Sequence, residues 1–151
     1  WWFIYEAPRT EQQSFSYLSI RGVNKLAQPA DLLYSKEHEW VKVDGDTAII
    51  GITNYAQNSL GDIVYVELPR IGAQIAQFGN VGVVESVKAV SDLFTPVGGE
   101  VIEINSELEN DPALVNREPF DGGWMFKLKL ADGAQTSGLL SPEDYDKLTQ
   151  E

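Results

Sequence analysis

Hydrophobic and polar positions alternate over several short stretches of the chain, and this pattern predicts β-strands. The stretch EWVKVDGDTAIIGI is read as two strands that meet at the Asp44-Gly45 turn signal. DIVYVELP is expected to be a strand that stops at Pro69. In WMFKLKL, the alternation places Met125 and two lysines on one face, and Phe126 and two leucines on the other.

Capping residues indicate two helices. TNYAQNSLG follows Thr53, whose hydroxyl can cap a helix, and Gly61 can end that helix in the left-handed conformation. At the C-terminus, Ser141 precedes a proline and two acidic residues, which together favour the start of a helix.

Two further signals concern the second half of the chain. Asp111 is expected to be the N-cap of a short helix whose first residue is Pro112. TPVGGEVIEIN predicts a turn at Gly98-Gly99 that is followed by a strand.

Strands that recur about every ten residues are typical of a small β-sandwich or barrel with short helices. The length of 151 residues suits one domain with a real core. Residues 1–30 look unlike the rest, and their opening WWFIYEAPRTEQQ has no clear period. We therefore expect them to be an N-terminal extension outside the fold, with residues 31–151 as the domain. The apolar opening WWFIY is far shorter than the roughly 20 residues that span a bilayer, so we expect no membrane span.

The net charge of −12 argues against binding to nucleic acid or to anionic membranes. It favours partners with basic patches, where charge acts mainly on the encounter rate. The chain has no cysteine, which excludes disulfides, thiolate zinc sites and cysteine nucleophiles. We expect a monomer.

Few residues suggest catalysis or metal binding. His38 is the only histidine. A zinc site usually needs three or four converging ligands, so a structural or surface role is expected for His38 and no metal is predicted. The glycines match neither a dinucleotide fingerprint nor a P-loop, and Ser86 and Ser91 lack a histidine suited to complete a triad. We therefore expect no catalytic residue.

Lys88, in VVESVKAVSD, is the only lysine between Val43 and Phe126. One interpretation is an exposed strand lysine with no specific role, because most lysines lie on the surface. The other is an amine that a β-turn presents for covalent attachment of a group by an external enzyme. The pattern alone leaves Val81–Val90 as one strand and does not decide between them.

Four segments together resemble the glycine cleavage system H-protein family, from about Asp31 to the C-terminus. They are YSKEHEWVKVDGDTAIIGIT, YAQNSLGDIVYVELP, GVVESVKAVSDLFTPVGGEVIEIN and NDPALVNREPFDGGWMFKLK. The resemblance implies a mostly β, lipoyl/biotinyl-like hybrid barrel-sandwich with short helices and a C-terminal helix. It further implies that Lys88 lies at a hairpin tip and carries lipoic acid through an amide.

The resemblance also implies a shuttle that is not itself an enzyme. In the family, the lipoyl arm receives an aminomethyl group from a pyridoxal-phosphate glycine decarboxylase (P protein). A tetrahydrofolate-dependent aminomethyltransferase (T protein) then takes the one-carbon unit, and dihydrolipoyl dehydrogenase (L protein) reoxidises the dithiol. A lipoate-attaching enzyme is the further partner. The location would be the cytoplasm of a bacterium or the mitochondrial matrix of a eukaryote.

A surface cleft holds the loaded arm in the family. The resemblance carries this role to Glu39 of the HEW motif and to Asp92, four residues after Lys88. Ser59 stands at a cleft position that is histidine in some relatives, so the chain departs from the family pattern there.

Other functions stay open at the level of sequence. A swinging-arm domain of a 2-oxo acid dehydrogenase would lack the HEW and GGWMFKLK segments, and a biotinyl carrier usually has methionines beside its lysine. A lipoyl donor that passes lipoate to other proteins fits the same residues. So does an interaction module in which Lys88 is unmodified.

Overall fold

The computed structural model describes residues 29–131 and 136–150. The strands are β1 (Leu33–Tyr34), β2 (Glu39–Asp44), β3 (Thr47–Ile52), β4 (Ile63–Glu67), β5 (Gln74–Ile75), β6 (Asn80–Ser86), β7 (Val90–Phe94), β8 (Gly99–Ile104) and β9 (Phe126–Leu130). The helices are α2 (Asn54–Leu60), α3 (Glu107–Asn110), α4 (Leu114–Arg117) and α5 (Pro142–Thr149).

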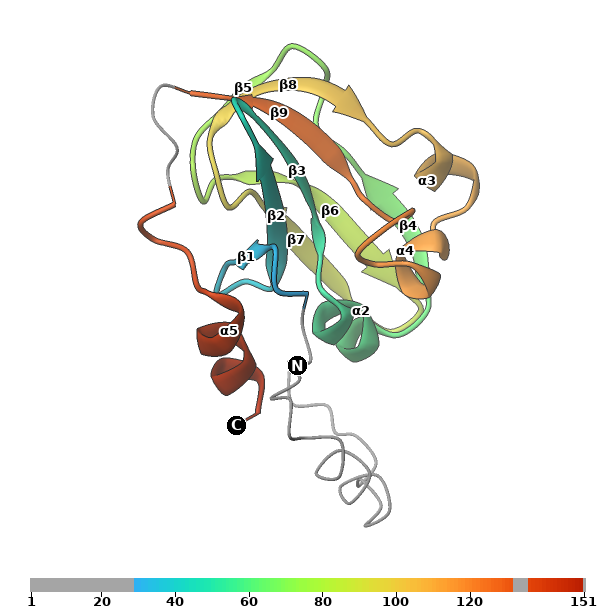
Figure 1. Cartoon of the computed structure of the whole chain (residues 1–151). Coiled ribbons are helices and arrows are strands. Elements are labelled where there is room, and N and C mark those ends of the chain that lie inside the picture. Colours follow the sequence, from blue (N-terminus) through green and yellow to red (C-terminus); the bar gives the residue numbers. More distant parts are fainter. Residues whose placement is uncertain (1–28, 132–135, 151) are drawn as a thin grey trace.

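The strands form two antiparallel sheets that face each other across one core. The larger sheet has the strand order β1-β2-β3-β9-β8-β5, and the smaller has the order β4-β6-β7 (Figure 1). Both sheets contribute to a single hydrophobic cluster, which includes Val41, Ile50, Val101 and Leu128 from the larger sheet and Val66, Val84 and Leu93 from the smaller. This mostly β arrangement, with short helices and a C-terminal helix, confirms the barrel-sandwich expected from the sequence.

Alternation along the strands explains how the sheets bury one face. In β3, Ala48, Ile50 and Ile52 are buried, and in β9, Phe126 and Leu128 are buried. Burying one fully enclosed aliphatic side chain contributes about 1.5–3 kcal/mol, so this shared face accounts for much of the driving force for folding.

The placement of Met125 on the lysine face of the last strand is wrong. Met125 is fully buried in the main cluster and precedes β9, which begins at Phe126. Its backbone N–H donates to the carbonyl of Ile50 over 2.8 Å. The two-residue period does not apply to Met125, because the residue lies outside the regular strand.

The predicted β2–β3 hairpin is confirmed. Asp44 pairs with Thr47, and Gly45 between them has φ 67°. A positive φ is unfavourable for residues with a Cβ, so glycine suits this position. The tight connection sets the register of the whole β2–β3 pair.

The capping predictions for the two longer helices are confirmed, apart from the conformation at Gly61. The Thr53 hydroxyl accepts from the N–H of Ala56, and the Ser141 hydroxyl accepts from the N–H of Asp144. Gly61 does end α2 with a positive φ, but its φ 85° and ψ −156° lie outside the left-handed helical region. An extended ψ lets the chain turn directly into β4.

The short helix after Asp111 begins later than predicted. Asp111 is the C-cap of α3, and α4 begins at Leu114 with Ala113 as its N-cap. The Asp111 carboxylate pairs with the Arg117 guanidinium, so it does not cap a backbone N–H of the helix. The ion pair competes with capping for the same carboxylate oxygens.

The turn predicted at Gly98-Gly99 is also displaced. The chain bends at Pro96 and Val97, and Gly99 is already the first residue of β8. A Cβ at Gly99 would lie 2.1 Å from the carbonyl oxygen of Lys129, so glycine permits the close approach of β9.

The proposed extension at residues 1–30 lies almost wholly outside the described residues, and its boundary stays a prediction. Within residues 29–131 and 136–150, no helix is both long and apolar enough to cross a membrane.

Candidate functional site

Lys88 lies in the tight connection between β6, which ends at Ser86, and β7, which begins at Val90. The N–H of Ser86 donates to the carbonyl of Ala89 over 2.8 Å. The Ser86 hydroxyl accepts from the N–H groups of Lys88 (3.2 Å) and Ala89 (3.0 Å). The stretch Val81–Val90 is therefore two strands with a turn. The sequence does hold a signal for that turn, because serine is favoured at the first position of a β-turn.

The Lys88 side chain is exposed at the tip of this hairpin. The ion pairs formed within the described parts of the chain join other residues. Val87 and Val90 beside it are 69% and 68% exposed, which leaves the amine on an open, partly apolar surface. An external enzyme can therefore reach the amine without unfolding any part of the sheet.

The segment from Gly61 to Ile63, which joins α2 to β4, packs against the hairpin that carries Lys88. The N–H of Val87 donates to the carbonyl of Asp62 over 3.0 Å. A Cβ at Gly61 would lie 3.5 Å from Cε of Lys88, so this segment also passes the lysine side chain. The Asn116 amide holds the segment, because it donates to the carbonyl of Gly61 (2.9 Å) and accepts from the N–H of Ile63 (2.9 Å).

Glu39, the first residue of β2, is buried with an exposed fraction of 2%. One carboxyl oxygen accepts from the Ser35 hydroxyl over 2.6 Å, and the other accepts from the N–H of Phe94 over 3.3 Å. Burial raises the pKa of Glu39 to about 8, although these two hydrogen bonds oppose the rise. The carboxyl thus joins β2 to β7, the strand that continues from Lys88, and favours its neutral form near pH 7.

The other two cleft candidates lie on the elements that surround Lys88. Asp92 is exposed on β7, and Phe94 follows on the same face two residues later. Ser59 is buried in α2, whose C-terminal end leads to Gly61. Within the part of the chain that the structure describes, no hydrogen bond or ion pair joins any two of Glu39, Ser59, Lys88 and Asp92. A common cleft therefore stays a prediction.

His38 has a structural environment. Its side chain is buried, its Nδ1 lies 2.8 Å from the Tyr145 hydroxyl, and its ring stacks on Tyr55 at 4.8 Å. Burial lowers the pKa of His38 to about 4, so the ring is neutral near pH 7. Among the described residues, no group of three or more acidic and histidine side chains could hold a metal ion. Sequence reasoning does not single out Tyr145, because its hydroxyl partners lie far away along the chain.

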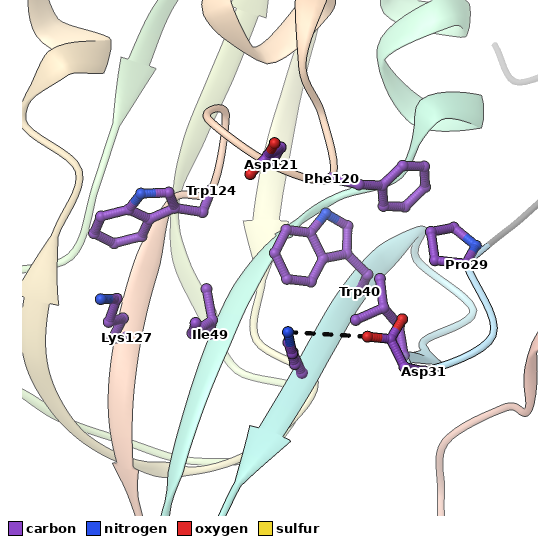
Figure 2. Close-up of a pocket in the computed structure, with 10 residues that line it drawn as sticks. Pro29, Asp31, Trp40, Ile49, Phe120, Asp121, Trp124 and Lys127 are labelled. Carbon is purple, nitrogen blue, oxygen red and sulfur yellow. Dashed lines mark ion pairs between the residues drawn. The ribbon is translucent and has the colours of Figure 1, made fainter.

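A pocket of about 240 Å³ lies on the outer face of the larger sheet. Its lining includes Trp40, Phe120 and Trp124 (Figure 2). Lys42 and Asp31 also line it and form an ion pair at 3.9 Å. None of the four candidate residues lines it, so the pocket does not belong to the site around Lys88.

Known proteins are similar to this chain over most of its length. The family model described as "Glycine cleavage H-protein" matches residues 32–151. A glycine cleavage system H protein of Carboxydothermus hydrogenoformans is 56% identical over 123 residues, which are 82% of this chain and 95% of that protein. One of Opitutus terrae is 57% identical over 121 residues, 80% of this chain and 95% of that protein.

A solved structure shows the same fold. The crystal structure of a glycine cleavage system H protein from Mycobacterium marinum superposes with a TM-score of 0.75 at 32% identity. The match covers 82% of this chain and 99% of that one. The family model, the relatives and the shared fold therefore agree that this chain belongs to the glycine cleavage H-protein family.

Proposed function

We propose that Lys88 carries lipoic acid through an amide bond and that the protein shuttles a one-carbon unit within the glycine cleavage system. Membership of the family supports a lipoyl carrier role in that system. The observation that supports the assignment to Lys88 is the position of its amine, exposed at the tip of a hydrogen-bonded hairpin.

The surroundings of Lys88 fit such an attachment. Acylation removes the positive charge of the amine, and the ion pairs within the described residues do not use that charge. The Ser86 turn holds the backbone of Lys88, so that only the side chain needs to move. The lipoyl group supplies a reversible disulfide, and the chain has no cysteine that could attack it.

The partners we propose are the glycine decarboxylase, the aminomethyltransferase, dihydrolipoyl dehydrogenase and an enzyme that attaches lipoate. All must approach the same hairpin. The chain carries a net charge of −12, and Asp62 and Asp92 are exposed on the segments next to Lys88. Basic rims on the partners would therefore speed encounter at this end of the molecule. The related proteins are bacterial, which favours the cytoplasm as the place of action.

We assign the loaded arm to a cleft formed by Glu39, Asp92 and Ser59. Glu39 supports this assignment because its buried carboxyl bridges to β7. A protonated amine beside it would favour the ionised carboxylate and form a charge-assisted hydrogen bond. Exclusion of water from the same place would slow premature hydrolysis.

The proposal is tested by expressing the chain with a lipoate ligase and lipoate and then measuring intact and peptide masses. We expect one lipoyl group per chain, located on the peptide that contains Lys88. An unmodified Lys88 peptide would refute the carrier function and favour an interaction module. Peptides that contain Lys127 and Lys129 are the internal control, since β9 holds these lysines in the middle of the larger sheet.

A second assay separates a glycine shuttle from a lipoyl donor. The lipoylated protein is mixed with the glycine decarboxylase, and exchange of bicarbonate into the carboxyl group of glycine is followed. Exchange that depends on the lipoylated protein supports the shuttle. Lipoylated protein without exchange activity would favour lipoyl donation.

A further inference from the structure

The hydroxyl of Tyr145 links three segments that are far apart along the chain. Tyr145 lies on α5 and is fully buried. Its hydroxyl oxygen is 2.8 Å from Nδ1 of His38 and 2.7 Å from Oγ1 of Thr53. Burial raises the pKa of this phenol well above its ordinary value, so the hydroxyl keeps its proton and can donate to one partner while it accepts from the other.

The first of these contacts holds a strained turn. His38 has φ 73°, which costs about 1–2 kcal/mol for a residue with a Cβ. Its N–H donates to the carbonyl of Ser35 (3.1 Å), and the N–H of Ser35 donates to the carbonyl of Glu39 (2.9 Å). The turn from Ser35 to Glu39 therefore sets the position of the Glu39 side chain at the start of β2. The Tyr145 hydroxyl holds the His38 ring of this turn in place.

The second contact reaches the start of α2. Thr53 Oγ1 caps this helix by accepting from the N–H of Ala56 over 3.2 Å. The N–H of Thr53 also donates to the carbonyl of His38 over 3.1 Å. At its other end, α2 leads into Gly61, which faces the side chain of Lys88. One hydroxyl thus joins the turn before Glu39 to the helix that ends beside Lys88.

We propose that Tyr145 is a positioning residue for the arm cleft, acting through His38 and Thr53 without touching the arm. This inference rests on the function proposed above. The Tyr145 hydroxyl keeps the Glu39 carboxyl and α2 in fixed relative positions, and these positions exclude water from the loaded arm. Loss of the hydroxyl leaves the His38 ring and the α2 cap with one hydrogen bond fewer in a buried place, so both segments open more often.

The test compares Tyr145→Phe with Tyr34→Phe in the full-length chain, before and after lipoylation. Both rings are fully buried and stack on each other with 4.7 Å between their centroids. The Tyr34 hydroxyl donates to the carbonyl of Pro29 over 2.7 Å and so lies outside the hydroxyl network of Tyr145. Tyr34→Phe therefore controls for the loss of any buried hydroxyl at the α5–β1 contact.

Two readouts are taken. In the chain before lipoylation, amide hydrogen exchange at residues 35–39 and 54–57 is expected to rise about tenfold in Tyr145→Phe and to stay unchanged in Tyr34→Phe. In the loaded chain without acceptor enzymes, hydrolysis of the aminomethyl group, which breaks its bond to sulfur and gives formaldehyde, ammonia and the free dithiol, is expected to be about tenfold faster in Tyr145→Phe alone.

Release of the one-carbon unit at the wild-type rate in Tyr145→Phe, or equally fast release in Tyr34→Phe, would overturn the inference. Amide hydrogen exchange that is unchanged in Tyr145→Phe at both residues 35–39 and residues 54–57 would also overturn it. If Tyr145→Phe does not fold, His38→Asn takes its place, since asparagine tolerates the left-handed backbone and the ring contact is lost. The same two effects are then required. A wild-type chain that accepts no lipoyl group would instead refute the proposed function, and the mass spectrum shows this before either comparison.

Discussion

The Ser86 hydroxyl accepts a hydrogen bond from the backbone N–H of Lys88 over 3.2 Å, so the turn that exposes the lysine is held by a side chain two residues before it. The same oxygen accepts from the N–H of Ala89 over 3.0 Å. Because both donors belong to the turn itself, Ser86 determines how rigidly the hairpin tip presents the amine.

We expect Ser86→Ala to lower the free energy of unfolding by about 1–2 kcal/mol and to slow lipoylation of Lys88, because two N–H groups of the turn lose their acceptor. Urea denaturation and a time course of lipoylation by mass spectrometry measure the two effects. Ser91→Ala is the matched control, since the Ser91 hydroxyl donates to the carbonyl of Asp92 in an exposed position. Equal lipoylation rates in wild type and Ser86→Ala would show that the turn does not need this hydroxyl.

Lys88→Arg is expected to abolish lipoylation and glycine–bicarbonate exchange while it leaves the fold unchanged. The side chain is exposed, and surface substitutions away from special features usually change stability by less than about 0.5 kcal/mol. Mass spectrometry, the exchange assay and thermal denaturation give the three readouts. Residual exchange in this variant would mean that another residue carries the arm.

Glu39→Gln is expected to remove a pH dependence of stability. The pKa of Glu39 is about 8 in the folded protein, above its ordinary value of 4.5, so the folded state binds the proton more tightly. The stability that this proton provides is complete below pH 4.5 and is lost as the pH rises to about 8.

The window from pH 6.5 to 8 isolates Glu39, because the pKa of His38 is lowered from 6.5 to about 4 and its own contribution is already complete above pH 6.5. Over this window the wild type should lose on the order of 2 kcal/mol relative to Glu39→Gln. Urea titrations of both proteins at the two pH values measure the difference. Parallel pH profiles would show that Glu39 titrates normally.

Asn116→Ala is expected to destabilise the fold by about 2–4 kcal/mol, because the amide bonds to Gly61, Ile63 and the Gln57 side chain at once. The segment from Gly61 to Ile63 would become more mobile, and amide hydrogen exchange at Val87 should increase because its N–H donates to the carbonyl of Asp62. Asn110→Ala changes an exposed asparagine at the end of α3 and serves as the control. A stability loss no larger than that of the control would contradict the bracing role.

Several features of the fold could be predicted from local sequence, and they share a physical cause. The β2–β3 hairpin and the caps at Thr53 and Ser141 depend on residues within a few positions of one another. The local pattern failed at Asp111 and Met125, where a contact outside the local period decides the outcome: an ion pair with Arg117 and a backbone bond to Ile50.

By itself, the sequence determined a mostly β chain with capped helices, and the resemblance of its motifs singled out Lys88. Only the tertiary structure decided that Lys88 lies in a turn braced by Asp62, that Glu39 is buried against β7, and that Tyr145 holds His38. The Glu39–Phe94 and His38–Tyr145 contacts span 55 and 107 residues. Periodicity and capping carry no information over such separations, because packing of the two sheets and α5 brings these groups together.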